Sequence, residues 1–262
     1  MTMAGNTVRL TFEGQLAHVV LDRPEQLNAM TEEMTAELAD ALRQAGSASC
    51  RALLITAEGR AFSAGRDISQ AEPGTEDGGE VLSRLFNPVI RQVADLRMPT
   101  IAAVQGACLG TGLGLALACD VVFVAEDAKV GSPFAKIGAV LDSGAHKAFV
   151  QRLGGARALY LIYSGLLISG KQAADWGLVS RSVPSADLQA EARAFAAAVA
   201  DGPTAAFAES KRLVRQIAER DMSLAEVLDA EAAAQSRASR TRDYVEGFTA
   251  FLDRRAPTFT GH

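Results

Sequence analysis

The chain has 262 residues, of which 48% are apolar and 22% are charged, so it is long enough to bury one large core, with or without a smaller appendage. Its 26 basic and 31 acidic side chains are scattered and give a net charge of −5, which argues against a nucleic-acid-binding protein because such proteins rely on a basic face. The three cysteines form no CxxC pair, which predicts reduced thiols and a cytoplasmic protein without disulfides.

The first half of the chain alternates strand-like and helix-like segments. Residues 7–24 alternate in polarity around Glu13-Gly14, which predicts a β-hairpin. A helix is expected from about Thr31, a residue type that caps helices, because apolar residues then recur at helical spacing. The later predicted elements are a buried strand at 51–59, a loop entering a possible helix at 61–70, an acidic mobile loop at 71–80, a helix at 81–96, a buried strand at 100–110, a helix at 112–120, and a strand with a turn at 121–133.

The character of the sequence changes near residue 200. The repeated order of strand, turn and helix before that point is typical of an α/β protein. The segments 202–220, 223–239 and 241–257 are helical in pattern, with no strand among them. The sequence therefore predicts an α/β core over residues 1–200 and an all-helical region over 201–262, which we expect to make subunit contacts.

Several familiar motifs are incomplete. GTGLG (110–114) lacks the GxGxxG spacing of a dinucleotide site, and GLLISGKQ (165–172) has Gln172 where a phosphate loop needs Ser or Thr. GxSxG, the signature of a hydrolase nucleophile elbow, does not occur. The three histidines show no metal-ligand spacing, so no metal is expected. The most apolar stretch, residues 99–125, contains four glycines and Asp120, which argues against a membrane span, and the start of the chain does not read as a signal peptide.

Two loops rich in glycine, FSAGRD (62–67) and CLGTGLG (108–114), each follow an apolar strand and lead toward a helix. Such a junction leaves backbone N–H groups unpaired at the helix start. Two of these groups converging on one point would form an oxyanion hole, which a thioester carbonyl needs when it becomes an enolate. Two ordinary tight turns would give the same pattern, and the sequence pattern alone leaves both interpretations open.

These loops and two other segments resemble the crotonase superfamily, the enoyl-CoA hydratases and isomerases. The resemblance rests on LDRPEQLNAM (21–30), AFSAGRDI (61–68), AAVQGACLGTGLGLALACDVVFVAEDAKVGSPFAKIG (102–138) and AADWGLVS (173–180), and it covers nearly the whole chain. It implies an α/β spiral of ββα units with an all-helical C-terminal region that builds homotrimers, often paired into hexamers. It also implies an acyl-CoA thioester substrate, with no metal or redox cofactor.

The resemblance also implies the site residues. The backbone amides of Arg66 and Thr111 would form the oxyanion hole. Arg23 would contact the CoA phosphates, and Phe251 and Arg254 would reach the CoA of a neighbouring subunit. The other positions that the resemblance assigns to the CoA path or the acyl site are Ala61, Ser63, Ala64, Asp67, Ile68, Gly110 and Phe134.

The chain departs from the hydratase pattern at both glutamate positions, which are Gly114 and Phe134 here. Syn addition of water needs one group that takes a proton from water and another that delivers a proton to carbon, and neither residue can do this. Asp142 supplies a carboxylate where 2-(1,2-epoxyphenyl)acetyl-CoA isomerases and related Δ3,Δ2-enoyl-CoA isomerases carry an aspartate. One base that takes and returns a proton suffices for isomerisation, so the leading hypothesis is an enoyl-CoA isomerase with Asp142 as acid/base.

Asp142 also has simpler interpretations. It could cap the helix that follows it, a role compatible with catalysis. Burial near Val140 and Leu141 would raise its pKa, whereas a helix N-terminus would lower it. His146 stands four residues later and could contact Asp142 if both were helical.

Three other functions remain open at this stage. The first is a hydratase with a non-standard acid/base. The second is a crotonase-like hydrolase or dehalogenase that uses Asp142 as a nucleophile. The third is a non-catalytic CoA-binding or RNA-binding member of the fold, although the acidic net charge argues against RNA.

Overall fold

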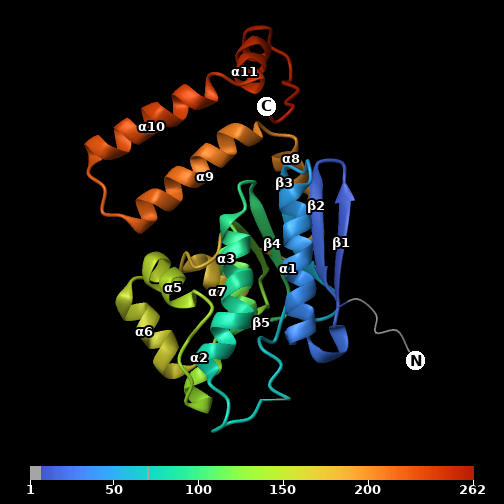
Figure 1. Ribbon diagram of the computed structural model, residues 1–262, viewed down its shortest axis with the longest axis vertical. Coiled ribbons are helices and arrows are strands. Elements are labelled where there is room, and N and C mark those ends of the chain that lie inside the picture. Colours follow the sequence, from blue (N-terminus) through green and yellow to red (C-terminus); the bar gives the residue numbers. More distant parts are fainter. Residues whose placement is uncertain (1–6, 70) are drawn as a thin grey trace.

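The chain folds around a six-stranded sheet with the strand order β1-β2-β3-β4-β6-β9 (Figure 1). The computed structural model describes residues 7–69 and 71–262. β1 and β2 are antiparallel, and every later pair in this sheet is parallel, which is the arrangement that helical crossovers produce. A second sheet has the order β5-β7-β8. The strands are β1 (Val8–Glu13), β2 (Leu16–Leu21), β3 (Ala52–Ala57), β4 (Thr100–Val104), β5 (Ala107–Leu109), β6 (Val121–Ala125), β7 (Lys129–Gly131), β8 (Ile168–Ser169) and β9 (Arg181–Val183).

Helices pack around the sheets, and helices α8 to α11 make up most of the C-terminal part of the chain (Figure 1). The longer helices are α1 (Glu32–Ser47), α3 (Asn87–Asp95), α4 (Thr111–Ala118), α5 (Ala145–Leu153), α6 (Gly155–Ser164), α8 (Leu188–Ala200), α9 (Thr204–Glu219), α10 (Leu224–Ala238) and α11 (Arg242–Leu252). The short ones are η1 (Pro24–Gln26), α2 (Gly78–Val81), η2 (Leu82–Phe86), η3 (Pro133–Ile137) and α7 (Gly170–Asp175).

The predicted hairpin and the first helix are confirmed. β1 and β2 pair up to Glu13 and Leu16, and Gly14 takes φ +60° in the turn between them, a conformation that favours glycine. Thr31 caps α1 because its hydroxyl accepts a hydrogen bond from the Met34 amide at 3.1 Å. The apolar face of α1 is buried, so the helix is held against the sheet by the stripe that its sequence predicts.

The predicted strand at 100–110 is wrong in one respect, since it is two strands in two different sheets. β4 belongs to the six-stranded sheet and β5 to the three-stranded sheet. The chain turns between them at Gly106, which has φ +55°. An added Cβ at Gly106 would lie 1.8 Å from the Arg60 carbonyl oxygen, so only glycine allows this corner.

The predicted helix at 81–96 is also modified. It begins earlier, at Gly78, and widens into the π-helical turn η2 before continuing as α3. Asp77 starts α2 by accepting hydrogen bonds from the Gly79 and Glu80 amides. The possible helix at the end of 61–70 does not form within the described residues, because this segment pairs instead with Met30 and with β5.

Helix α4 lies at the centre of the molecule and carries the second glycine-rich loop. Seven of its eight residues are buried, and it packs against α3, α5 and β5. The small residues in its sequence let these neighbours approach closely. Its first residue is Thr111, so its N-terminus opens toward the loop that the sequence assigns to the oxyanion hole.

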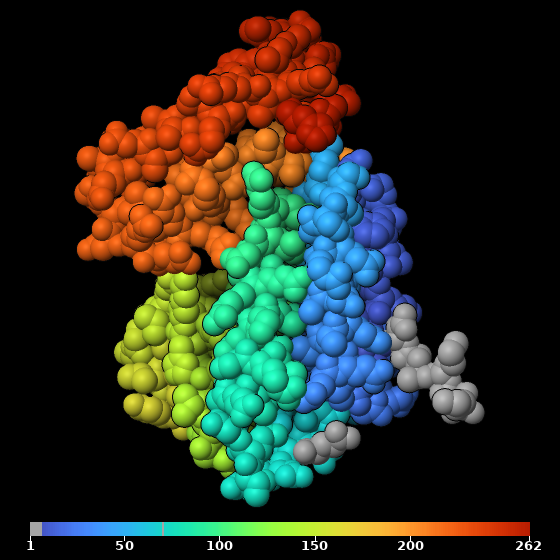
Figure 2. Space-filling model, viewed as in Figure 1, coloured from blue at the N-terminus to red at the C-terminus, as the bar shows by residue number. Residues whose placement is uncertain are grey.

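The helices α9, α10 and α11 extend from the core, as the sequence predicts (Figure 1). α9 buries no residue fully and is tied to the core by polar contacts, with Lys211 Nζ 2.7 Å from Asp120 and Arg215 Nη2 2.9 Å from Asp95. A cavity of about 790 Å³ lies between α9 and the core helices, where Figure 2 shows a hollow beneath the orange helix. A domain boundary near residue 200 stays a prediction.

Candidate active site

Two loops that are distant in the sequence lie side by side after β3 and β5. The Ser63 amide donates to the Ala107 carbonyl oxygen at 3.0 Å, and the Leu109 amide donates to the Ser63 carbonyl oxygen at 2.9 Å. These bonds continue a parallel ladder, which aligns the two segments. The ladder brings the loop of Arg66 next to the N-terminus of α4.

Gly65 makes the close approach of the two loops possible. It has φ +94°, and an added Cβ would lie 2.9 Å from the Leu109 carbonyl oxygen and 3.6 Å from the Thr111 nitrogen. A side chain at this position would therefore push the loops apart. The Arg66 amide follows directly in the chain.

The two backbone amides that the sequence assigns to an oxyanion hole are both unpaired. Thr111 is the first residue of α4, and its amide has no partner within the helix. The Met30 amide donates to the Gly65 carbonyl oxygen (2.8 Å) and the Asp67 amide to the Met30 carbonyl oxygen (2.9 Å), which leaves the Arg66 amide between them without a protein acceptor in the described part of the chain. Free N–H groups at a helix N-terminus are suited to bind a developing oxyanion.

Asp142 lies in the turn before α5 and does not cap that helix. α5 begins at Ala145, its N-cap residue is Gly144, and no side chain caps it. The helix-cap interpretation of Asp142 is therefore wrong, because the carboxylate stands two residues too early. Its Oδ1 atom is buried and finds no hydrogen-bond partner among residues 7–69 and 71–262. A buried polar atom without a partner is costly, which makes it a candidate functional group.

The environment of Asp142 favours its neutral form. Burial raises the pKa of the carboxyl group, and the Ser143 hydroxyl and the charges of His146 and Arg66 oppose this only in part. The Arg66 charge is thus near enough to Asp142 to influence its pKa. His146 is exposed on α5, and Asp142 precedes this helix, so the two are not neighbours on one helical face.

The Arg66 side chain is held by the acidic loop. Its guanidinium group donates to both carboxylate oxygens of Glu76, at 2.6 and 2.5 Å. The Arg66 charge holds the pKa of Glu76 below its ordinary value. The sequence predicts a mobile surface loop at 71–80. This segment is thus tied to the loop of Arg66 at one point. A cavity of about 500 Å³ lies between this loop, the start of α1 and η2.

Phe134 and Gly114, at the two hydratase glutamate positions, are packed in place. An added Cβ on Gly110 would lie 3.1 Å from the Phe134 ring, so the ring covers the turn that precedes Thr111. Phe134 also lines an apolar cavity of about 260 Å³. Gly114, on the next turn of α4, lies against Ser143.

The residues expected along the CoA path are found in one loop, but several are engaged within the protein. The Ser63 hydroxyl donates to the Asn28 carbonyl oxygen at 2.8 Å, and Asp67 pairs with Arg23 at 3.2 Å. Ser69 and Arg23 together hold the pKa of Asp67 below its ordinary value. Ala61 is buried, Ala64 is half-buried and Ile68 is exposed.

The sequence analysis missed Asn28, which organises this loop. Asn28 is fully buried, its Nδ2 donates to the carbonyl oxygens of Glu58 (2.9 Å) and Ala61 (2.8 Å), and its Oδ1 accepts from the Arg23 amide at 2.7 Å. Its φ of +53° lies in the left-handed region, where asparagine is one of the few tolerated residues. The LDRPEQLNAM segment contains this residue, but polarity alone cannot indicate that it is buried.

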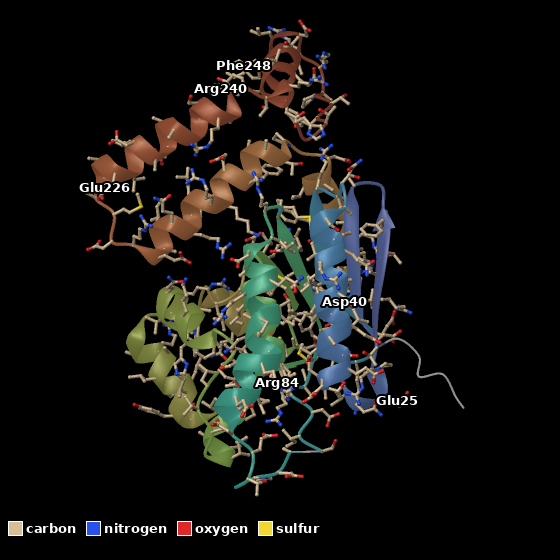
Figure 3. All side chains as sticks on the ribbon, in the orientation of Figure 1. Glu25, Asp40, Arg84, Glu226, Arg240 and Phe248 are labelled. Carbon is tan, nitrogen blue, oxygen red and sulfur yellow. The ribbon has the colours of Figure 1, made fainter. Side chains whose placement is uncertain are left out.

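Phe251 and Arg254 are not brought to these loops by their own chain. Phe251 is 81% exposed on α11, and Arg254 follows that helix. In Figure 1, α11 and α2 lie at opposite ends of the molecule. Phe248, labelled in Figure 3, is likewise exposed on α11.

Metal sites and membrane spans each need a specific arrangement of side chains. In the described ranges, no three His, Cys, Asp or Glu side chains are arranged to hold a metal ion. No described helix has both the length and the apolar character needed to cross a bilayer.

Comparison with known proteins gives consistent matches over the whole chain. The model of the family described as "Enoyl-CoA hydratase/isomerase" matches residues 11–262. A relative from Rhodobacter capsulatus, named "Probable enoyl-CoA hydratase", is 36% identical over 99% of this chain and 100% of its own length. The 1,2-epoxyphenylacetyl-CoA isomerase of Escherichia coli (strain K12) is 37% identical over 93% of this chain and 94% of its own length.

Solved structures match in the same way. The enoyl-CoA hydratase of Bacillus anthracis superimposes with a TM-score of 0.89 and 28% identity, covering 98% of this chain and 100% of that chain. A protein from Magnetospirillum magneticum, described as an enoyl-CoA hydratase/carnithine racemase, gives a TM-score of 0.89 with 29% identity over 99% of this chain and 97% of that one. The similarity therefore covers the fold as well as the sequence.

Proposed function

The chain belongs to the enoyl-CoA hydratase/isomerase family, and from that premise we propose that it is an enoyl-CoA isomerase in which Asp142 transfers the proton. The family acts on acyl-CoA thioesters, and the fold is the α/β crotonase fold with C-terminal helices. Which reaction the chain performs depends on the side chains around the thioester. Those side chains support isomerisation better than hydration.

In the proposed reaction, the thioester carbonyl oxygen of a 3-enoyl-CoA accepts hydrogen bonds from the amides of Arg66 and Thr111. The Asp142 carboxylate removes a proton from the α-carbon, and the electrons pass into a dienolate whose oxygen the two amides stabilise. The carboxylic acid then returns a proton to the γ-carbon, the carbonyl reforms, and the double bond moves to the 2-position. Atoms and charge balance without water or a second acid.

The observation that carries this proposal is the buried, unpaired carboxylate oxygen of Asp142 beside the loop of Arg66. An oxygen in this state is free to bind a proton, and its raised pKa makes it a stronger base than an exposed aspartate. Hydration would need a second acid/base near the substrate, and the two positions that supply one in hydratases hold Gly114 and Phe134. The unpaired Asp142 oxygen and the lack of an acid at positions 114 and 134 favour a reaction with one proton carrier.

The CoA moiety is proposed to follow the loop of Ala61, Ser63, Ala64, Asp67 and Ile68. The unpaired Arg66 amide lies within this loop, which would place the thioester beside it. Arg23, which pairs with Asp67 of this loop, is proposed to contact the CoA phosphates.

We also propose that the protein assembles as a homotrimer or a dimer of trimers. Large apolar side chains are exposed along the C-terminal helices, including Val214 on α9, Leu228 on α10 and Leu252 on α11. Exposed apolar surfaces of this kind commonly mark subunit contacts. In such an assembly, Phe251 and Arg254 would meet the CoA of a neighbouring copy.

The test uses purified wild-type protein and Asp142→Asn with 3-enoyl-CoA and 2-enoyl-CoA. We expect the wild type to isomerise 3-enoyl-CoA, and we expect Asp142→Asn to bind CoA thioesters normally but lose most proton transfer. Asp40→Asn, at an exposed position on α1 (Figure 3), is the matched control and should behave like the wild type.

Three results would contradict the proposal. Equal isomerisation rates in wild type and Asp142→Asn would remove Asp142 from the reaction. Water addition to 2-enoyl-CoA without isomerisation would indicate a hydratase with another acid. An acyl group trapped on Asp142 and detected by mass spectrometry would indicate a nucleophile instead of a base.

A further inference from the structure

We propose that Gly114 is a positioning residue for Asp142, because the absence of a side chain on this turn of α4 lets the Asp142 loop pack directly against the helix. This role rests on the isomerase function proposed above and adds a residue that does not touch the substrate.

The contact at Gly114 leaves no room for a side chain. An added Cβ would lie 2.3 Å from the Ser143 Cβ and 2.5 Å from the Ser143 carbonyl oxygen, whereas real Cβ atoms essentially never approach within 3.0 Å of another heavy atom. The obstructing atoms are backbone and Cβ atoms, which cannot rotate out of the way. Any residue other than glycine at position 114 must therefore displace Ser143, and with it the adjacent Asp142.

The loop itself depends on this packing. Ser143 has φ +53° and Gly144 has φ +78°, so two consecutive residues are in the left-handed region, which is uncommon for a residue with a side chain. Ser143 is only 4% exposed, and its hydroxyl makes no hydrogen bond within the described part of the chain. The loop is thus held in an unfavourable conformation by packing, and Gly114 is the surface that it packs on.

Helix α4 sets the distance between the base and the oxyanion hole. Thr111, which offers an amide, is the first residue of α4, and Gly114 is three residues later, about 4.5 Å along the axis at 1.5 Å per residue. On the other side of the same helix, an added Cβ on Gly112 would lie 2.5 Å from the Ser63 Cβ, so the loop of Arg66 also packs on α4. One buried helix therefore positions both amides and the carboxylate.

The test compares Gly114→Ala with the wild type. The added methyl group should move the Asp142 carboxylate by an ångström or so, and a shift of that size should lower kcat for isomerisation roughly 10²-fold, with KM and CoA-thioester binding nearly unchanged. The acidic limb of the pH profile should also move to lower pH, because water would reach the displaced carboxyl group. Gly155→Ala, at the start of α6 with no atom within 4 Å of the added Cβ, is the control and should keep wild-type kinetics.

A second pair of variants tests the same contact from the loop if Gly114→Ala does not fold. Ser143→Gly suits the left-handed conformation and should stay close to the wild type. Ser143→Val places a β-branched residue at φ +53°, where it is strongly disfavoured, and should lower kcat as Gly114→Ala does. Wild-type kcat in Gly114→Ala, or in Ser143→Val, would overturn the positioning role.

The kinetics of the Gly114 and Ser143 variants can be told apart from a failure of the proposed isomerase function. If the wild type does not isomerise 3-enoyl-CoA, the isomerase assignment fails, and the positioning role fails with it. If the wild type isomerises 3-enoyl-CoA and Asp142→Asn does not, but Gly114→Ala keeps the wild-type rate and pH profile, only the positioning role is wrong.

Discussion

Replacing Asp142 with asparagine should make the protein more stable at neutral pH, although it removes the proposed base. The wild-type carboxylate is buried and one of its oxygens has no hydrogen-bond partner in the described part of the chain. Burial raises its pKa above the ordinary value, so the folded state binds the proton more tightly than the unfolded state. Ionisation of Asp142 therefore costs the folded state free energy, and asparagine avoids this cost because it never ionises.

The sign of the effect depends on pH. Below the unfolded pKa of about 3.9, the group is protonated in both states, and the two proteins should be equally stable. As pH rises from there through the raised folded pKa, the wild type loses stability relative to the variant. Above that pKa the difference is constant, so the full gain is present at pH 7.

The size of the gain is the extra free energy that the charge adds to the cost of the unpaired oxygen. Leaving a buried acceptor without a partner costs roughly 1–3 kcal/mol, and asparagine keeps such an acceptor while removing the charge. We therefore expect a gain at the lower end, about 1 kcal/mol at pH 7, which corresponds to about 2–4 °C in Tm for a protein of this size.

Chemical unfolding of the wild type and Asp142→Asn at pH 7 and pH 4 measures this gain, with Asp40→Asn as the control. A gain at pH 7 that disappears at pH 4 supports the argument. If Asp142→Asn is less stable than the wild type at pH 7, the reasoning is refuted. The ionised carboxylate would then stabilise the folded state instead of destabilising it.

Two further predictions concern the backbone amide and the thiols. Thr111→Pro should lower kcat by roughly 10²–10³-fold, because proline is tolerated at the first position of a helix yet lacks the N–H that would bind the oxyanion. Thr111→Ala keeps the amide and should lose far less activity. Similar losses of kcat in both variants would exclude the amide role. Burial raises the pKa of Cys119 to about 12 and also raises the pKa of Cys108. An aromatic disulfide reagent should therefore label at most Cys50 in the native protein and all three thiols after unfolding. Labelling of two thiols in the native protein would contradict this burial.

The sequence predicts the local elements of this fold better than their connections. The hairpin around Gly14 and the helix after Thr31 depend on a turn, a cap and an apolar stripe, which are all local signals. The corner at Gly106 depends on the position of the Arg60 carbonyl oxygen, which lies in another segment. The sequence could therefore not indicate that residues 100–110 belong to two sheets.

At the candidate site too, the sequence indicates local features but not contacts between distant segments. The loops of Arg66 and Thr111 each follow an apolar strand, a pattern that fits unpaired amides and ordinary tight turns alike, so only the family resemblance selects these two amides. Asp142 is a carboxylate in an apolar stretch, but the prediction that it caps a helix is wrong, because α5 begins two residues later than the sequence suggests. The contact of Gly114 with Ser143 joins residues 29 positions apart, and no periodicity in the sequence can indicate it.

The tight fit of Gly114 against Ser143 restricts how this protein could acquire a hydratase reaction during evolution or in the laboratory. A glutamate introduced at position 114 would overlap the backbone of the following loop, so that single exchange should damage the protein before it adds any chemistry. Rebuilding the loop at 142–144 alone would sacrifice the proposed base. The two regions must therefore change together, which makes the proposed reaction difficult to leave by successive point mutations.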